Sequence, residues 1–365
     1  MVSTAVRSPV NAAELAAALA EASGTVRVRG AGTKLRWAPE VQPGLELSTA
    51  GLDRLLEHNA GDLTAVLEAG VPLASAQGTF AEAGQMLALD PPDPGSTIGG
   101  LIATGDSGPL RSRYGGARDL VLGMRVALAD GTIAKSGGTV IKNVAGYDLA
   151  KLFTGSYGTL GAILEVSLRL HPLPPDTATA IGRSSHPDAL GRGVSAMAHA
   201  RLEQLGLDVR WDAGEGMVLA RFGGAAPRPQ AEAAEGVLAE AGLETELRED
   251  DEPLWRAQRE GQRSPEGGLS VRVSAVQTDL PELLRLAARH DATLVGRGAL
   301  GVSWLCVDDA DRGSGLVEQL RARHVAVVLD RPPGLELDPR GPLDPGAAAL
   351  MARVKDRFDP DGKLV

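Results

Sequence analysis

Glycine is concentrated in one internal stretch of this sequence, and that concentration limits what the chain can fold into. Residues 88–161 hold 15 of the 46 glycines, one residue in five, against one in eight over all 365 residues. Apolar segments such as residues 120–128 are interleaved with the glycines, and Asp130-Gly131 is typical of a hairpin turn. A flexible linker would lack such segments. The glycines therefore indicate positions where the backbone adopts positive φ or approaches a ligand closely, which predicts a binding site.

Charge and composition exclude several classes of protein. Hydrophobic residues make up 43% of the chain and charged residues 23%, which is ordinary for a folded globular protein and excludes a disordered one. Asp and Glu outnumber Lys and Arg by 47 to 37, so a nucleic-acid-binding role has no electrostatic support. The excess is uneven, with a net charge of −2 over residues 1–174 and −8 over residues 175–365. An anionic ligand is therefore expected in the first part.

Cysteine content and hydropathy limit the location and the metal chemistry. Cys306 is the single cysteine, which excludes an internal disulfide framework, a multi-thiolate zinc site and iron–sulfur clusters. There is no run of about 18 apolar residues, so we expect no membrane span. The first residues are interrupted by Arg7, Pro9 and Glu14 and lack the apolar core of a secretory signal. We expect a cytoplasmic protein.

The predicted helices and strands indicate an α+β fold with a break at a proline-rich segment. Asn11 and Glu14 have capping-box spacing before a helix at residues 15–21, and residues 25–28 alternate like a strand. The prolines of residues 171–176 end a strand predicted at 162–170. Beyond them the pattern predicts an antiparallel sheet backed by helices. Its strands are expected near 177–183, 207–212, 216–222, 269–276, 292–296, 301–307 and 325–329, its helices near 187–205, 229–242, 280–290 and 312–323, and a final helix at 345–357.

Two glycine-containing segments are suited to hold an anion. Arg29-Gly-Ala-Gly-Thr-Lys34 directly follows a predicted strand, and consecutive N–H groups in such a turn can form a concave nest for phosphate oxygens. An ordinary strand-terminal turn is the alternative interpretation. In residues 91–108, prolines stiffen the chain, Ser96 or Thr97 can cap a short helix, and Gly99-Gly100 removes side chains that would block access. That segment favours an anion such as a pyrophosphate.

A third segment, residues 142–163, completes a series that resembles a known flavoprotein family. The strings RGAGTKL, DPPDPGSTIGG, IATGDSG, RYGGARDLVLG and KNVAGYDLAKLFTGSYGTLGAI, in this order, resemble the FAD-binding domain of the vanillyl-alcohol oxidase / p-cresol methylhydroxylase family. Within it they are most similar to the FAD-binding (E) subunits of bacterial glycolate oxidase. The resemblance covers roughly residues 5–174, and residues 254–258 and 358–362 extend it weakly. It implies an α+β fold with a two-subdomain FAD-binding domain at 1–174. It further implies an α+β cap domain, an antiparallel sheet with helices, at 175–340. A C-terminal helix and tail at 341–365 would return to the FAD domain.

The resemblance also implies which residues bind FAD. The first phosphate loop would be Arg29, Gly30, Ala31, Gly32, Thr33 and Lys34. The pyrophosphate and one face of the flavin would be wrapped by Pro94, Gly95, Ser96, Thr97, Ile98, Gly99 and Gly100. Residues near the isoalloxazine or ribityl chain would be Thr104, Gly105, Ser107 and Gly108, and main-chain contacts on the flavin–adenine side would come from Gly161 and Ile163. Thr33 stands where family members that attach FAD covalently carry a histidine, so the resemblance implies non-covalent FAD.

The same resemblance implies a function and leaves alternatives open. Oxidation of a 2-hydroxy acid needs a base near the hydroxyl, but the histidines (His58, His171, His186, His199, His290 and His324) lack metal-ligand spacing and are interpreted as surface or helix-end residues. We therefore expect no metal site, and leave the catalytic residues open. The leading interpretation is the FAD-binding subunit of a complex that oxidises glycolate or another small 2-hydroxy acid, with a paralogous flavoprotein subunit and an iron–sulfur subunit as partners. The alternatives are a self-sufficient oxidoreductase of another small hydroxy acid or alcohol, and a non-catalytic scaffold.

Three further features carry weaker predictions. Residues 296–301 fit the GxGxxG pattern of a dinucleotide site, but a strand follows where a helix is required, so a hairpin turn is the better interpretation. Cys306 lies in an apolar strand and is predicted to be an inert buried thiol. Arg272 points either to a substrate carboxylate or to a salt bridge within the cap.

Overall fold

Three main β-sheets organise the chain in the computed structural model, which describes residues 4–139 and 148–365. The first is a parallel sheet of order β1-β3-β2, built from β1 (Ala5–Arg7), β2 (Val26–Arg29) and β3 (Leu45–Ser48). The second is an antiparallel sheet of order β4-β5-β9-β7-β8, built from β4 (Leu55–Asn59), β5 (Thr64–Glu68), β7 (Val121–Ala127), β8 (Ile133–Gly137) and β9 (Ala162–Arg169). The mixed helix-and-sheet architecture confirms the predicted α+β class.

Short helices surround these two sheets. The first, α1 (Ala12–Glu21), begins at Asn11, whose Oδ1 accepts a hydrogen bond from Glu14 N at 2.9 Å, as the sequence predicts. It buries Leu15 and Leu19 completely. The remaining short elements are η1 (Leu35–Trp37), α2 (Leu73–Glu82), β6 (Gln85–Met86), α3 (Ile98–Thr104), α4 (Arg111–Tyr114), α5 (Ala117–Leu120), α6 (Ala150–Phe153) and β10 (His171–Pro172). Residues 142–147 of the third sequence segment lie outside the described residues.

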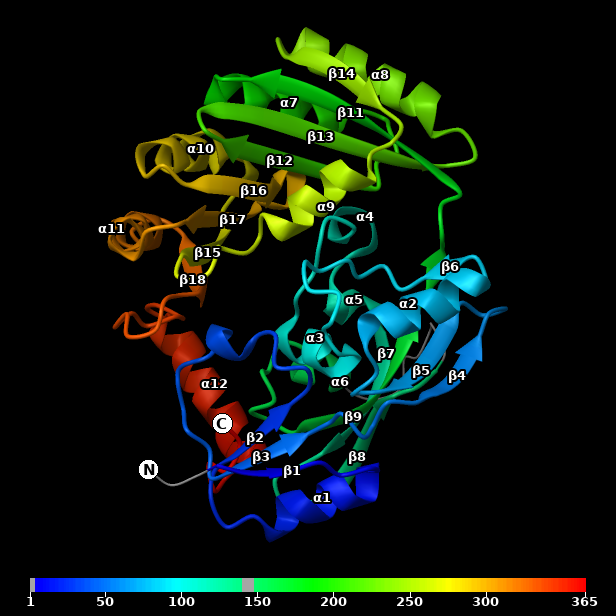
Figure 1. Cartoon of the computed structure of the whole chain (residues 1–365), viewed down its shortest axis with the longest axis vertical. Helices are drawn as coiled ribbons and strands as arrows, with labels where there is room; N and C mark the ends of the chain where they lie inside the picture. The colour runs from blue at the N-terminus through cyan, green and yellow to red at the C-terminus, as the bar shows by residue number, and fades with distance from the viewer. Residues whose placement is uncertain (1–3, 140–147) are drawn as a thin grey trace.

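The third sheet is antiparallel, as the sequence rhythm predicts for the second part of the chain, and has eight strands where seven were predicted. Helices α7, α8, α10 and α11 cover one of its faces, and α9 lies toward the other half of the molecule (Figure 1). The strand order is β14-β11-β13-β12-β16-β17-β15-β18. The strands are β11 (Asp176–Ser184), β12 (Gly206–Asp212), β13 (Glu215–Gly224), β14 (Glu244–Arg248), β15 (Leu269–Ser274), β16 (Thr293–Arg297), β17 (Val302–Val307) and β18 (Val325–Asp330).

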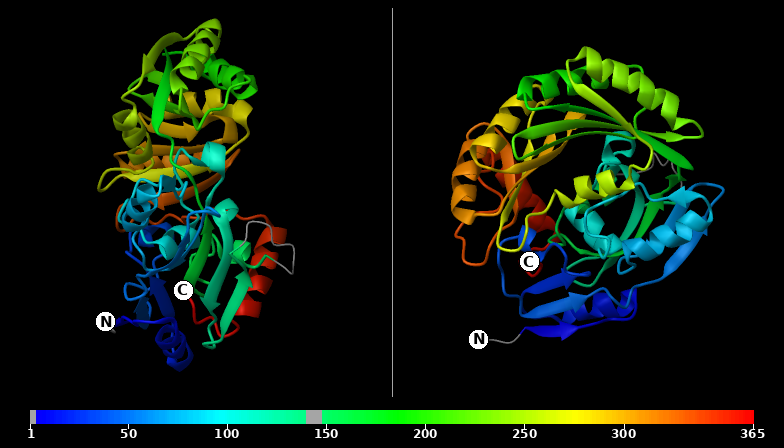
Figure 2. Two further views of the ribbon diagram at one scale, coloured as in Figure 1. Left: turned by 90° about the vertical axis from the view of Figure 1, so that its right-hand side faces the viewer. Right: turned by 45° about the horizontal axis from the view of Figure 1, so that its top comes forward.

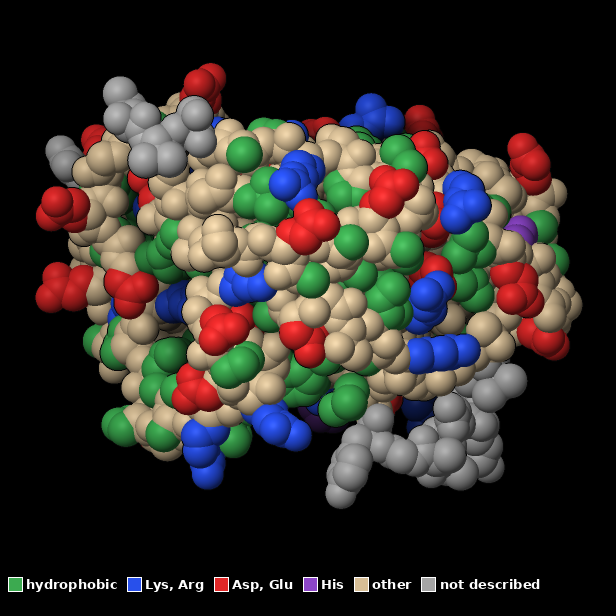
Figure 3. All heavy atoms as spheres, turned by 90° about the horizontal axis from the view of Figure 1, so that it is seen from below, with side chains coloured by type: hydrophobic (Ala, Val, Ile, Leu, Met, Phe, Trp, Pro, Cys, Tyr) green, Lys and Arg blue, Asp and Glu red, His purple; other side chains and the backbone are tan. Residues whose placement is uncertain are grey.

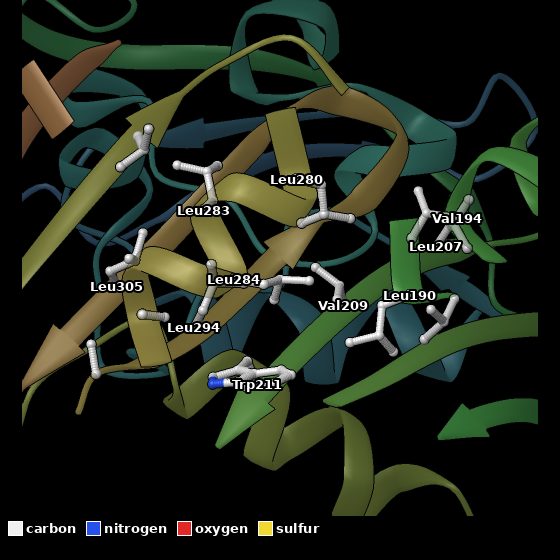
Figure 4. Packing of buried hydrophobic residues seen from close by; sticks show 14 of the residues in the cluster. Leu190, Val194, Leu207, Val209, Trp211, Leu280, Leu283, Leu284, Leu294 and Leu305 are labelled. Carbon is white, nitrogen blue, oxygen red and sulfur yellow. The ribbon is translucent and has the colours of Figure 1, made fainter. Parts of the chain in front are cut away.

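Helix packing against this sheet forms the largest apolar core. The helices are α7 (Pro187–His199), α8 (Pro227–Glu240), α9 (Glu252–Glu260), α10 (Leu280–Arg289) and α11 (Ala310–Arg321), with the short turns η2 (Gln277–Asp279) and η3 (Gly298–Leu300). Leu283 and Leu284 of α10 meet Leu294 and Leu305 of the sheet (Figure 4). Residues 296–301 comprise the end of β16 and the turn to β17, which confirms the hairpin interpretation.

The C-terminal helix α12 (Pro345–Phe358) runs back to the N-terminal sheets, as the left view of Figure 2 shows in red. The residues after it pair with β2, because Val26 N donates to Lys363 O at 2.7 Å and Val365 N donates to Val26 O at 3.0 Å. The division of the chain into domains at residues 174 and 340 stays a prediction.

The surface carries mixed charges. In the view from below, acidic and basic side chains alternate with apolar ones and no continuous basic field is seen (Figure 3). Of the helices in residues 4–139 and 148–365, not one combines the length and apolar character that crossing a membrane requires.

Candidate cofactor site

The main pocket lies where the first glycine loop meets the start of α3. It spans about 1120 Å³, including solvent at its mouth, which is the scale of a site for a large organic ligand. Many residues predicted from the sequence line it, namely Arg29, Gly30, Ala31, Gly32, Thr33, Lys34, Ser96, Thr97, Gly100 and Thr104. The structure therefore brings together two segments that are more than 60 residues apart in the sequence.

Close packing against the Thr97 side chain explains the first glycine of the loop, Gly30. A Cβ added at Gly30 would lie 2.1 Å from the Thr97 hydroxyl oxygen, a distance that no side chain tolerates. That hydroxyl caps α3, where it accepts a hydrogen bond from Gly100 N at 3.3 Å. Gly32 has a φ of 79°, which favours glycine. The loop is thus pressed against the start of α3, as a cradle of main-chain atoms requires.

The buried side chain of Lys34 connects the glycine loop to the segment before α3. Its Nζ donates to Thr33 Oγ1 at 3.0 Å and to Ser96 Oγ at 2.5 Å, and it lies 3.5 Å from Asp106 Oδ2. Burial lowers the pKa of the Lys34 ammonium, while the carboxylates of Asp106 and Asp93 oppose that shift. This buried cation and the open glycine loop beside it suit an anionic group such as the diphosphate of FAD.

Other predicted residues lie around the pocket without lining it. The sequence predictions for Pro94, Gly95, Ile98, Gly99, Gly105, Ser107, Gly108, Gly161 and Ile163 fall in this group. Gly99 and Gly108 face the protein itself, because an added Cβ would lie 2.6 Å from Ala69 Cβ and 1.8 Å from Asp90 O, respectively. Ile98 and Ile163 are buried in the apolar core beneath α3. Gly105 and Ser107 line a second, smaller space.

Sequence reasoning did not single out several residues that line the main pocket. Tyr157 is one of them, and it lines the pocket wall. Its backbone has a φ of 58°, which non-glycine residues rarely adopt, and its N–H donates to Ala103 O at 2.8 Å. Arg340 reaches the pocket from the segment between β18 and α12. Tyr157 lies within a quoted motif, whereas no local pattern indicates Arg340. The others are Arg27, Val28, Leu35, Ala38, Pro39, Val41, Ala103, Thr159 and Val365.

The smaller space is rich in hydrogen-bond donors. Arg111 of α4 and Arg272 of β15 line it together with Trp37, Trp304 and the carboxylate of Asp106. Both indole N–H groups are buried and have no acceptor among the described residues. Arg272 makes no ion pair within the described part of the chain, so the alternative of a cap salt bridge is not found there. Burial and the nearby Arg272 charge lower the pKa of Arg111, which an incoming anion would reverse.

No histidine lines either space among the described residues. His58 Nε2 lies 3.0 Å from Gln85 Oε1, and His171 packs against the Tyr114 ring. Within residues 4–139 and 148–365, no three His, Cys, Asp or Glu side chains gather closely enough to hold a metal ion. Burial raises the pKa of the Cys306 thiol to about 12, as expected for an inert buried cysteine.

Comparisons with solved structures support the fold. Two structures of high overall similarity are an alkyldihydroxyacetonephosphate synthase and FgChi7B, each with a TM-score of 0.72 at 13% sequence identity. Each alignment covers 98% of this chain, with 74% of the first structure and 89% of the second. At this identity the likeness concerns the fold alone.

Comparisons of sequence identify the N-terminal part. Residues 3–137 match the family model described as an FAD binding domain. Glycolate oxidase subunit GlcE of Escherichia coli K12 is 41% identical over 122 residues, which are 33% of this chain and 35% of that protein. Glycolate oxidase subunit GlcD of Bacillus subtilis is 36% identical over 179 residues, which are 48% of this chain and 37% of that protein. A D-lactate dehydrogenase of Archaeoglobus fulgidus is 38% identical over 190 residues, which are 50% of this chain and 42% of that protein.

The chain spans 35–42% of the length of these three relatives. The matched segment contains both the glycine loop and α3, whose geometry suits the diphosphate of FAD. FAD is thus the cofactor, and residues 3–137 match the model of an FAD binding domain in a chain that is similar to glycolate oxidase subunits.

Proposed function

We propose that this chain is an FAD-dependent oxidoreductase and acts as the FAD-binding subunit of a complex that oxidises glycolate or another small 2-hydroxy acid. The observation that carries this proposal is the pocket between the glycine loop and α3, in a domain whose relatives are named as glycolate oxidase subunits. When bound, FAD accepts the reducing equivalents of the substrate. Main-chain groups of residues 29–34 and the buried Lys34 would hold its diphosphate.

Among the described residues that line the two spaces, no histidine offers a base, and this supports a role within a complex. Abstraction of a hydroxyl proton needs a group within hydrogen-bond reach whose pKa lies near neutrality. No histidine of the described residues lines either space, and Asp106 already pairs with Lys34 and Arg263. We therefore infer that a paralogous flavoprotein subunit supplies the base and that an iron–sulfur subunit takes the electrons onward.

A second candidate function follows from the smaller space. Arg111, Arg272 and the indole N–H groups of Trp37 and Trp304 would supply charged and neutral donors to a carboxylate. This donor set favours a chain that binds a small hydroxy acid itself and reduces its own flavin.

Anaerobic titration distinguishes the two candidates. The complex purified from the native host should lose its flavin absorbance on addition of glycolate, and should contain both partners in fixed ratio. The isolated chain should keep its absorbance if the base lies on a partner. Bleaching of the isolated chain by a hydroxy acid, abolished in Arg272→Gln but not in Arg285→Gln on the outer helix α10, would establish the second candidate instead. A host complex that contains no FAD would overturn both.

A further inference from the structure

The cations that line the cofactor pocket differ in whether they already have a carboxylate partner. Arg27 and Arg29 both pair with Glu46, at 3.0 and 3.1 Å. Lys34 lies between Asp93 and Asp106. Arg340 differs from these three, because its guanidinium makes no ion pair within the described part of the chain. An anion that enters the pocket can therefore pair with Arg340 without competing against an internal carboxylate.

The segment that carries Arg340 is held on both sides by the C-terminal part of the chain. Arg321 Nη2 donates to Asp338 O at 2.6 Å, and Val328 N donates to Pro339 O at 2.8 Å. Arg340 N donates to Asp338 Oδ1 at 3.0 Å. The next residue is Gly341, whose φ is 71° and where a Cβ would lie only 2.6 Å from Arg321 Nε. This anchoring fixes the backbone on either side of Arg340.

A second anchor connects the same segment to the first part of the chain. Arg331 Nη1 donates to Arg36 O at 3.0 Å, within η1 and next to the glycine loop. The Arg340 side chain is exposed. Its charge and the Arg272 charge oppose the rise in the pKa of the Tyr157 hydroxyl that burial causes. Arg340 thus lines the pocket from a braced segment, on a wall that it shares with Tyr157.

We propose that Arg340 is a cofactor-positioning residue that pairs with the diphosphate of FAD. A guanidinium presents N–H donors in a planar fork that matches phosphate oxygens, and a pocket cation with no carboxylate partner among the described residues contributes its charge to the ligand. Arg340 lies about 200 residues beyond the matched domain at 3–137. FAD retention therefore depends on the C-terminal part of the chain, in addition to the domain that the sequence comparison identifies. This proposal rests on FAD binding and not on the substrate.

Binding of FAD and of riboflavin to the flavin-free full chain tests the proposal. Loss of a hydrogen bond to a charged group predicts that Arg340→Gln raises the Kd of FAD about tenfold. The Kd of riboflavin, which lacks phosphates, should not change, and the salt dependence of FAD binding should weaken. Arg340→Lys should recover part of the affinity. Arg353→Gln, which removes an exposed cation on α12, is the matched control and should bind FAD like the native chain.

Two results would overturn the proposal. One is an unchanged Kd of FAD in Arg340→Gln, and the other is an equal loss of FAD and riboflavin affinity, which would indicate a distorted pocket. Arg321→Gln serves as an independent variant. It removes the hydrogen bonds that hold the segment, whereas Arg340 itself is not substituted. The Arg321→Gln variant should also bind FAD more weakly. A cooperative thermal unfolding transition would show that this variant is folded. A native chain that binds no FAD would refute the cofactor assignment, a result distinct from failure of the Arg340 variants alone.

Discussion

At the scale of single residues, Gly30 and Thr97 depend on each other. The Gly30→Ala variant would place a methyl group 2.1 Å from the Thr97 hydroxyl oxygen, so Thr97 must turn away and α3 loses its cap. Loss of such a cap costs about 1 kcal/mol, and the displaced loop should lower the flavin content of the purified protein. Absorbance per protein and thermal unfolding measure both effects.

Two further variants show whether this contact is the cause. Thr97→Ala in the Gly30→Ala background removes the clashing oxygen and should restore part of the flavin content. Gly24→Ala is the matched control, since no atom lies within 4 Å of its added Cβ. An undiminished flavin content in Gly30→Ala would contradict the close packing described here.

Thr33 carries the prediction about how the cofactor is attached. Its hydroxyl lies 3.2 Å from Ser96 Oγ and accepts from Lys34 Nζ. A threonine hydroxyl does not form the covalent flavin bond that a histidine at this position is expected to form. Precipitation with acid or heat should therefore release all yellow chromophore into the supernatant. Flavin that stays with the precipitated protein would show that another residue forms a covalent bond.

At the scale of elements, local signals in the sequence predicted much of the fold. Asn11 marks the start of α1, and Asp130-Gly131 forms the turn between β7 and β8, because capping and tight turns depend on residues only a few positions apart. The edge strand β14 and the helix α9 were not predicted. β14 carries Glu244, Glu246 and Arg248, so it lacks the apolar alternation that identifies a strand.

The composition of the site was only partly predictable. The glycine loop and Thr97 lie in dense local motifs, which is why the sequence indicated them. The smaller space is lined by Trp37, Arg272 and Trp304, which come from three separate elements. Arg340 lines the main pocket and comes from a fourth part of the chain. Their proximity follows from sheet register and from the path of the chain between β18 and α12, which no short pattern in the sequence specifies.

The C-terminal tail is an element that depends on one buried carboxylate. Asp359 is 1% exposed, and its carboxylate accepts from Lys363 N at 3.0 Å, from Leu364 N at 2.7 Å and from Lys355 Nζ. Asp359→Ala would leave these donors without their acceptor and should cost about 2–4 kcal/mol of unfolding free energy.

Hydrogen exchange gives a local measurement of the same change. The Val26 amide donates to Lys363 O, so its exchange should accelerate in Asp359→Ala as the tail detaches from β2. FAD should also bind more weakly, because Val365 lines the pocket. Asp361→Ala, an exposed change in the same tail, is the control. Equal exchange at Val26 in both variants would contradict this role of Asp359.

At the scale of the whole molecule, a polar layer connects the N-terminal sheets to the eight-stranded sheet. Arg263, between α9 and β15, donates to Asp93 at 3.1 Å and to Asp106 at 2.9 Å, and its guanidinium lies 4.6 Å from the centre of the Trp37 ring. Asp106 also neighbours Lys34. The contact between the two parts of the chain is thus continuous with the cofactor pocket, which couples their relative position to the binding of FAD.

Asp90 lies in the same layer and makes the stability of the molecule depend on pH. Its carboxylate accepts from Leu110 N at 3.1 Å but forms no ion pair within the described residues, and burial raises its pKa to about 7. The native state then holds a proton that the unfolded chain, with an Asp pKa of about 3.9, has released. The unfolding free energy should therefore fall as pH rises from about 4 to about 7, by on the order of 4 kcal/mol, and level off above.

Asp90→Asn should remove this dependence, because the amide oxygen still accepts from Leu110 N and carries no charge to desolvate. Urea unfolding at pH 5 and pH 8 measures the difference, with Asp361→Asn as an exposed control. Because Gly108 packs directly on Asp90 O, the variant also keeps the backbone contact that positions the chain after α3. A native chain and an Asp90→Asn variant that lose equal stability between pH 5 and pH 8 would show that this carboxyl is ionised in the folded protein. The polar layer would then have to stabilise its charge, through Arg297 and Arg259 of the eight-stranded part, more strongly than burial opposes it.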